Sequence, residues 1–241
     1  MRTLFDVKFM LESIPDIVGF LPVTLVISVV AMFFGLLLGL AVALVKIYRI
    51  PLLKQLAFLF VSYVRGTPLL VQLYLCYYGI PIFVGYLNAV LGTQWSLMGV
   101  PAMVFVFFAY SINEAAYNSE TLRSAILSVD KGQIEAAYSV GMSNFQALKQ
   151  IVLPQAVKVA LPNLGNNMIS LIKGTSLAFA ISVVEITARG QIVAARGYRF
   201  FEVFVVVAAL YWGLTIAVEK LVYSLEKKFH AGVVGTDQGR G

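Results

Sequence analysis

The stretch "EAAYSVGMSNFQALKQIVLP", residues 135–154, decides how the rest of the chain has to be organised. Its Glu-Ala-Ala opening favours helix, Gly141 permits a turn, and Pro154 cannot continue the interior of a helix. The stretch therefore predicts a short helix, a bend and a second short segment that stops at Pro154. From the residues alone, this half-apolar element either lies on lipid headgroups or docks into another protein.

The residues around this stretch are too apolar for a water-soluble domain. Of the 241 residues, 60% are hydrophobic and 12% are charged, and the mean hydropathy is +0.86, whereas soluble domains carry about 25% charged residues. One cysteine and one histidine support neither an internal disulfide nor a metal cluster. We therefore expect an integral membrane protein, and we interpret its net charge of +6 as a topology signal and not as a sign of nucleic-acid binding.

Uncharged runs outline the membrane segments. A crossing needs roughly 20 apolar residues, and the runs divide into five such segments at a basic turn around Pro51 and at the turn-forming "NAVLGTQ". The predicted spans are about 17–45, 56–84, 97–122, 163–187 and 200–223. The predicted fold class is thus an all-α membrane protein, a single transmembrane domain over residues 1–241 with a cytoplasmic loop, 123–160, between spans three and four.

The distribution of Lys and Arg predicts the orientation of these spans. Eleven of the 18 basic residues fall on the side of the 47–54 turn, the third loop and the C-terminal tail, including Arg240. Five fall on the other side, including Arg2, and the last two are Arg65 and Lys173 within predicted spans. Because basic residues concentrate in the cytoplasm, the N-terminus is predicted outside and the C-terminus inside.

Small residues recur at every fourth position in two spans. One stripe consists of Ala31, Gly35, Gly39 and Ala43, and the other of Ala209, Gly213 and Ala217. Such stripes let helix backbones approach closely in lipid. We interpret both as helix packing inside one subunit, with a seam between subunits as the alternative.

Polar side chains on two spans form the main functional signal. In order, they are Asn113, Glu114, Tyr117, Asn118 and Thr121 in the third span, and Asn163, Asn166, Asn167, Ser170, Lys173 and Ser176 in the fourth. Their helical spacing predicts one polar face on each span, and the two faces suggest a shared wet cavity. A mid-span charge costs about 2.5–3.5 kcal/mol unless it pairs or faces water. Glu114 and Lys173 are thus either an ion pair between helices or contacts to a polar solute.

The pattern within 135–154 also matches a known family. Its Glu-Ala-Ala opening, Gly141 and the final Ile-Val-Leu-Pro resemble the "EAA" signature of ABC importer permeases. Further matches are "RGTPLLVQ" (65–72), the E-x-x-R of Glu120 and Arg123, "KGQ" (131–133) and "IKGTSLAFAISVVEI" (172–186). Together they resemble the polar amino acid subfamily, which contains histidine, glutamine, arginine and cystine permeases.

The resemblance implies a type I importer permease of the bacterial cytoplasmic membrane, a transport subunit and not an enzyme. Its partners would be a pair of ABC ATPase subunits, a second permease copy or close homologue, an extracytoplasmic solute-binding protein and membrane lipid. ATP and Mg would be bound by the ATPase, since the chain lacks a G-x-x-x-x-G-K-[ST] sequence and is expected to bind no cofactor. The resemblance favours docking for 135–154, with ATPase-coupling residues Glu135, Ala136, Ala137, Gly141, Leu153 and Pro154.

By the same resemblance the substrate is a polar amino acid, with cystine or a basic amino acid as candidates. The residues expected to line its path or bind it are Glu114, Tyr117, Asn118, Lys173, Thr175 and Ser176. Glu114 with Asn118 would hold the ammonium group. Lys173, Thr175 or Ser176 would hold the carboxylate. A passage without specific binding is the alternative role, and secondary transport driven by an ion gradient is the alternative function; no catalytic or metal-ligating residue is predicted.

For the arginines outside these two faces, the sequence suggests either a structural role or two alternative roles. Arg65, close to Thr67 and Pro68, is expected to snorkel or to tie down neighbouring backbone rather than to bind solute. Three arginines on the outer side either meet an acidic patch of the binding protein or anchor the chain at the membrane interface; they are Arg189, Arg196 and Arg199.

Overall fold

The computed structural model describes residues 5–234, with side chains through Phe229, so Arg2 and Arg240 of the topology prediction lie outside the described residues. In chain order the elements are α1 (Val7–Val18), α2 (Leu21–Ile47), α3 (Leu53–Gly66), α4 (Leu69–Tyr74), a π-helical turn (Leu75–Gly79), α5 (Ile80–Leu91), α6 (Ala102–Leu127), α7 (Lys131–Ser139), α8 (Asn144–Ala147), a second π-helical turn (Leu148–Val152), α9 (Leu153–Gly174), a 3₁₀ helix (Thr175–Ile181), α10 (Ile186–Gly197) and α11 (Phe200–Val234). The described residues contain no strand, and the predicted all-α fold class is confirmed.

Helices α2 and α6 form the centre of the fold because small residues let them pack closely. The whole first stripe, from Ala31 to Ala43, is buried. A β-carbon added to Gly39 would lie 3.0 Å from the carbonyl oxygen of Ala115, and one added to Gly35 would lie 2.5 Å from Cβ of Glu114. The packing interpretation is therefore confirmed for α2.

The second small-residue stripe behaves differently. Ala209, Gly213 and Ala217 on α11 are all exposed, and a β-carbon added to Gly213 would meet no atom within 4 Å. Helix α11 instead buries Val203, Val206 and Val207 against α1 and α10. Packing of this stripe inside one subunit is therefore a wrong interpretation, because α11 turns its branched side chains, not its small ones, toward the rest of the chain.

The second predicted span is not one helix. Residues 56–84 are broken at Thr67, whose extended backbone (φ −119°, ψ 145°) ends α3, and the chain restarts as α4 after Pro68. Proline excludes the residue before it from helical conformation, and the uncharged run concealed this boundary. The chain then stays helical to Leu91 and turns at Gly92 with φ +66°, inside the predicted turn.

Pro154 does not stop a helix, contrary to the prediction. It stands in the first turn of α9, where a missing N–H leaves no helical hydrogen bond unmade. The π-helical turn before it is wide, because the amide of Leu153 donates to the carbonyl of Leu148, five residues back. The helix that contains the start of the fourth predicted span, 163–187, therefore begins before residue 163. The helical run that follows it ends at Ser182 (φ +66°), before α10 begins.

Three helical segments of the described chain are long and apolar enough to cross a membrane: Leu21–Ile47, Leu69–Leu91 and Phe200–Phe229. A fourth is added if the bent pair Asn144–Ile181 and Ile186–Gly197, which meet at 56°, counts as one crossing. Helix α6 is 26 residues long but carries the polar face, which lowers its hydropathy. The number of five crossings stays a prediction.

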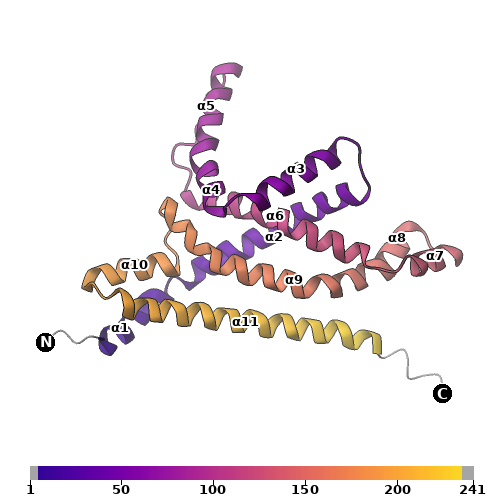
Figure 1. Cartoon of the computed structure of the whole chain (residues 1–241). Coiled ribbons are helices and arrows are strands. Elements are labelled where there is room, and N and C mark those ends of the chain that lie inside the picture. Colours follow the sequence, from indigo (N-terminus) through magenta and orange to yellow (C-terminus); the bar gives the residue numbers. More distant parts are fainter. Residues whose placement is uncertain (1–4, 235–241) are drawn as a thin grey trace.

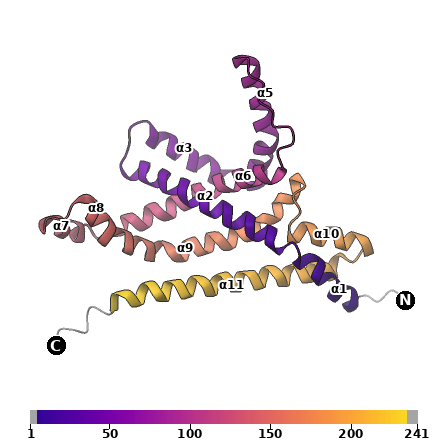
Figure 2. The same cartoon turned by 180° about the vertical axis from the view of Figure 1, so that it is seen from behind.

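Different helices lie at the two ends of the bundle (Figures 1 and 2). Helices α1 and α10 lie at one end, whereas α7, α8 and the C-terminal end of α11 lie at the other. Helix α5 projects away from the bundle and contains no buried residue. The α7 end therefore gathers two of the three basic segments that the charge distribution assigns to one side, the third loop and the C-terminal part of α11, and its placement in the cytoplasm stays a prediction.

Candidate functional site

A cavity of about 310 Å³ lies where α4, α6 and α9 meet. Its lining is Leu69 from α4, Asn113, Glu114 and Tyr117 from α6, and Asn167, Ser170 and Leu171 from α9. The polar faces of the third and fourth predicted spans thus contribute to one hollow. We refer to it as the Glu114 cavity, because Glu114 is the one charged side chain among these lining residues.

Hydrogen bonds fix the wall of the Glu114 cavity. Glu114 is 5% exposed, and its carboxylate accepts from the amide of Asn118 at 3.5 Å. The oxygen of Asn118 in turn accepts from the amide nitrogen of Asn167 at 2.8 Å, which joins α6 to α9. Asn118 is fully buried behind the cavity, so it orients Glu114 and the partner helix and does not form the lining itself.

Gln72 is a residue of this wall that the sequence analysis did not single out. Its amide nitrogen donates to the carbonyl oxygens of Val64 at 2.7 Å and Thr67 at 3.0 Å, and to the hydroxyl of Thr67 at 2.9 Å. Its oxygen accepts from the side chain of Asn113 at 2.9 Å. Gln72 therefore braces the bend at Thr67 and ties it to the cavity; a glutamine shortly after Pro68 in "RGTPLLVQ" was the available signal.

The other predicted substrate residues lie outside the lining. Lys173 is exposed, and no ion pair joins it to Glu114 in the part of the chain that the structure describes. Thr175 is fully buried, and its hydroxyl donates to the carbonyl of Ile172 at 2.8 Å. The hydroxyl of Ser176 donates to the carbonyl of Lys173 at 2.9 Å. In this conformation, therefore, the cavity contains Glu114 and Tyr117 but none of these three residues.

Glu185 is a second residue whose role was missed, although it lies in the quoted stretch 172–186. It is fully buried at the start of α10, where its carboxylate accepts from the backbone amide of Ala188 at 2.9 Å. It also accepts from the hydroxyls of Tyr211 at 2.7 Å and Thr24 at 3.4 Å. Glu185 therefore caps α10 and links it to α2 and α11.

The three outer arginines make ion pairs within the chain. Arg189 and Arg196 both contact the carboxylate of Asp16, at 3.0 and 3.1 Å. Arg199 contacts Glu202 at 3.1 Å, which is in the first turn of α11. The Asp16 contacts tie α1 to α10, and Arg199 also lies 3.9 Å from Asp6, the residue before α1. Much of the positive charge on this side is thus already matched by carboxylates.

The other end of the bundle carries an ion cluster of its own. Lys46, at the end of α2, contacts the carboxylate of Glu120, which also accepts from Arg123 at 2.9 Å. The ammonium of Lys46 lies 4.2 Å from the ring centre of Phe58 on α3. The E-x-x-R pattern thus joins α2, α3 and α6 near the α7 end.

The stretch 135–154 forms the outer surface of the α7 end. Asp130, and not Glu135, caps α7 by accepting from the amide of Gly132 at 2.7 Å; Glu135 is exposed in the middle of the helix. Gly141 has φ +82°, a conformation that glycine adopts without strain, and the chain turns there into α8. The predicted helix and bend are present, but the helix starts four residues before Glu135.

This surface is apolar and hollow. Val140 is 76% exposed and Phe145 is 70% exposed. Beside them lies a groove of about 470 Å³, lined by Gln133, Ala136, Ala137, Val140, Met142, Gln150, Ile151 and Gln155. Ala137 is buried, whereas Ala136, Leu153 and Pro154 are exposed. Large exposed apolar residues around a groove are typical of a surface that binds another protein or lipid.

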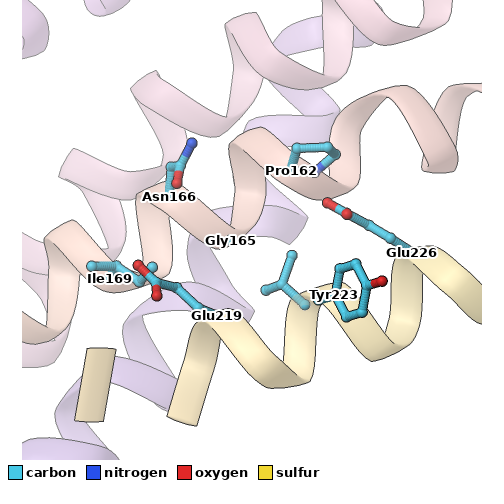
Figure 3. Close-up of a pocket in the computed structure, with 8 residues that line it drawn as sticks. Pro162, Gly165, Asn166, Ile169, Glu219, Tyr223 and Glu226 are labelled. Atoms are coloured by element: carbon cyan, nitrogen blue, oxygen red, sulfur yellow. The ribbon is translucent and has the colours of Figure 1, made fainter. Parts of the chain in front are cut away.

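Figure 3 shows a further hollow, of about 160 Å³, between α9 and α11. Glu219, Tyr223 and Glu226 reach it from α11, and Asn166 reaches it from α9. Asn166 therefore does not share the face of Asn167, although the two are neighbours in the sequence. No residue of α6 lines this hollow, so it does not join the two polar faces and is not the preferred site.

Comparisons with known proteins bear on the whole chain. Residues 31–231 match the family described as "Binding-protein-dependent transport system inner membrane component". The chain is 38% identical over 230 residues to the probable amino-acid ABC transporter permease protein PatM of Vibrio harveyi, covering 95% of this chain and 99% of that protein. It is 40% identical over 228 residues to the L-cystine transport system permease protein TcyL of Bacillus subtilis (strain 168), covering 95% and 93%.

A solved structure agrees with these relatives. The chain matches one described as "Crystal structure of an amino acid ABC transporter with histidines" with a TM-score of 0.79 and 34% identity, over 94% of this chain and 100% of that one. The relatives are transport components, which confirms the prediction that the chain is not an enzyme. The resemblance inferred from the sequence motifs is confirmed, and the chain belongs to the family of binding-protein-dependent transport system inner membrane components.

Proposed function

We propose that this chain is the permease subunit of an ABC importer that moves a polar amino acid into the bacterial cytoplasm. The observation that carries the proposal is the Glu114 cavity, where a buried carboxylate is surrounded by amides and two hydroxyls from two helices. A carboxylate at membrane depth is expensive unless a cation or water meets it. The ammonium group of an amino acid supplies that cation, with Asn118 holding the carboxylate in place.

ATP-driven coupling would act through the α7 end. The exposed apolar residues around Gly141 fit a groove on an ATPase subunit, so that closure of the ATPase pair pulls on α7 and α8. The coupling residues remain Glu135, Ala136, Ala137, Gly141, Leu153 and Pro154, of which Ala137 acts from inside the element because it is buried. ATP and Mg belong to the ATPase, and this chain would bind neither.

The assembly would contain two permease chains, two ATPase subunits and an extracytoplasmic solute-binding protein, in the cytoplasmic membrane with the N-terminus outside. The names of the relatives support an amino acid as the substrate. L-cystine is the first candidate, because a relative at 40% identity is named for it, and a basic amino acid is the second. Thr175 and Ser176 would act on the substrate only if another conformation opens the 3₁₀ helix toward the cavity.

Purification of the chain from its native membrane under mild conditions tests the assembly. We expect an ATPase subunit to remain bound to the wild-type chain and to be lost in Gly141→Asp, because an aspartate at φ +82° strains the turn. Gln55→Asp is a matched control, since it introduces the same side chain at an exposed position in the first turn of α3, outside the stretch 135–154. Recovery of the chain alone, with uptake that collapses when the ion gradient is removed, would support the secondary transporter instead.

A further inference from the structure

Arg65 lies beside the Glu114 cavity. It is in the last turn of α3, and its guanidinium carbon is 5.5 Å from the ring centre of Tyr117, a lining residue one helical turn after Glu114. Twelve residues separate it from Leu53 at the start of α3, a rise of roughly 18 Å along the helix. The guanidinium therefore lies well away from the basic turn before α3 and contacts a residue that lines the cavity.

The charge of Arg65 has no carboxylate partner in the described part of the chain, where the ion pairs involve other basic residues. Arg65 is also exposed, so its N–H donors are accessible from outside the described chain. A guanidinium presents a planar fork of donors that matches a carboxylate, and it stacks well on an aromatic ring. Stacking on Tyr117 leaves this fork available to a ligand.

Hydrogen bonds fix the backbone next to Arg65 relative to the cavity. Gln72 accepts from Asn113, which lines the cavity, and donates to the carbonyl of Val64, the residue before Arg65. This chain of hydrogen bonds joins the end of α3 to α6, where Glu114 lies. The backbone that carries Arg65 is therefore held in place relative to Glu114 before any ligand arrives, which reduces the entropy that binding costs.

From these contacts we propose that Arg65 recognises the carboxylate of the transported amino acid while Glu114 holds its ammonium group. Arg65 thereby takes the role that Lys173 was expected to have, because neither residue lines the cavity but the guanidinium of Arg65 contacts the lining residue Tyr117. The substrate class is a zwitterionic α-amino acid with a free carboxylate, and the proposal rests on the proposed function. It assigns to Tyr117 the role of a platform for the guanidinium.

Binding to the purified complex of permease and ATPase tests this proposal. The probes are L-cystine, L-arginine and L-histidine, each compared with its methyl ester, which keeps the ammonium group and lacks the carboxylate charge. For the amino acid that the wild type binds, we expect the free acid to bind about 10- to 100-fold more tightly than the ester, the range for a charge-assisted hydrogen bond. In Arg65→Gln this ratio should fall to about 1.

Matched variants separate recognition from a structural role. Glu114→Gln should weaken acid and ester equally and leave their ratio unchanged, and Lys173→Gln should leave both affinities unchanged. Arg65→Lys keeps the charge without the fork and should give an intermediate ratio; it replaces Arg65→Gln if that variant fails to retain the ATPase. A merely structural role for Arg65 would lower both affinities together, so the ratio is the deciding readout.

The outcomes are distinguishable. If Arg65→Gln and Arg65→Lys keep the wild-type ratio, or if the wild type binds acid and ester equally, the inference on Arg65 is overturned. If the Arg65 variants keep the wild-type ratio but Glu114→Gln loses binding, the proposed function is still supported. If Glu114→Gln changes nothing while the Arg65 variants abolish the ratio, Arg65 is supported and the role of Glu114 in the proposed function is wrong.

Discussion

A methyl group added at Gly35 tests how closely α2 must approach the helix that carries Glu114. The β-carbon of Gly35→Ala would lie 2.5 Å from Cβ of Glu114 and 3.3 Å from its carbonyl carbon, whereas carbon atoms make ordinary contact at about 3.5–4.0 Å. Because the obstacle includes backbone, α2 and α6 have to separate by about 1 Å. Glu114 is then displaced from the position that the Asn118 hydrogen bond fixes.

The expected cost follows from two opposing effects. Overpacking costs about 1–3 kcal/mol, with the upper end expected for so short a contact, while replacing a helical glycine by alanine gains about 1 kcal/mol. The net loss is about 2 kcal/mol, which corresponds to a fall in Tm of about 4–8 °C for a chain of this size. Gly213→Ala gains the same helix propensity without a clash, since nothing lies within 4 Å, and should leave Tm unchanged or raise it.

Thermal unfolding of the solubilised complex measures these differences, and retention of the ATPase confirms that each variant assembles. The Tm of Gly39→Ala should lie between those of the other two variants, because the nearest contact of its added β-carbon is 3.0 Å. The close packing of α2 on α6 would be refuted if Gly35→Ala and Gly213→Ala showed the same Tm and the same substrate affinity.

Two further changes probe the polar contacts that sequence inspection missed. Gln72→Leu removes the brace at the bend and leaves buried carbonyls without donors, so we expect a loss of about 1–3 kcal/mol in unfolding free energy and weaker substrate binding; Gln55→Leu, at an exposed position of α3, serves as the control. Glu185→Ala leaves the amide of Ala188 and the hydroxyl of Tyr211 without an acceptor and should lower Tm by several degrees, while Glu185→Gln keeps acceptors and should lower it less. Equal Tm values for the two Glu185 variants would contradict the capping role.

Residue spacing predicted much of the fold, but it did not show which neighbouring helix, if any, each helix face packs against. The stripe around Gly35 and the stripe around Gly213 look alike in the sequence, yet the first is buried against α6 and the second is exposed. Contacts between helices depend on how each helix is rotated, which a four-residue repeat does not specify. The break at Thr67 was readable from the proline after it, but the lack of charged residues obscured it.

The site shows the same limit. Helical spacing correctly suggested that polar residues of α6 and α9 gather, and Asn118 and Asn167 do meet at 2.8 Å. Spacing also placed Asn166 and Lys173 on that face, whereas Asn166 lines the hollow toward α11 and Lys173 is exposed. Gln72 escaped notice because its contacts require the chain to bend first.

Transport by the reconstituted importer tests the central claim most directly. The permease, its ATPase and its binding protein would be placed in liposomes, and uptake of labelled L-cystine, L-arginine and L-histidine would be followed with ATP on the ATPase side. We predict uptake of at least one of these amino acids that requires ATP, persists when ionophores abolish all ion gradients, and is lost in Glu114→Gln. Uptake that proceeds without ATP and stops when the ion gradients are abolished would contradict the proposed importer.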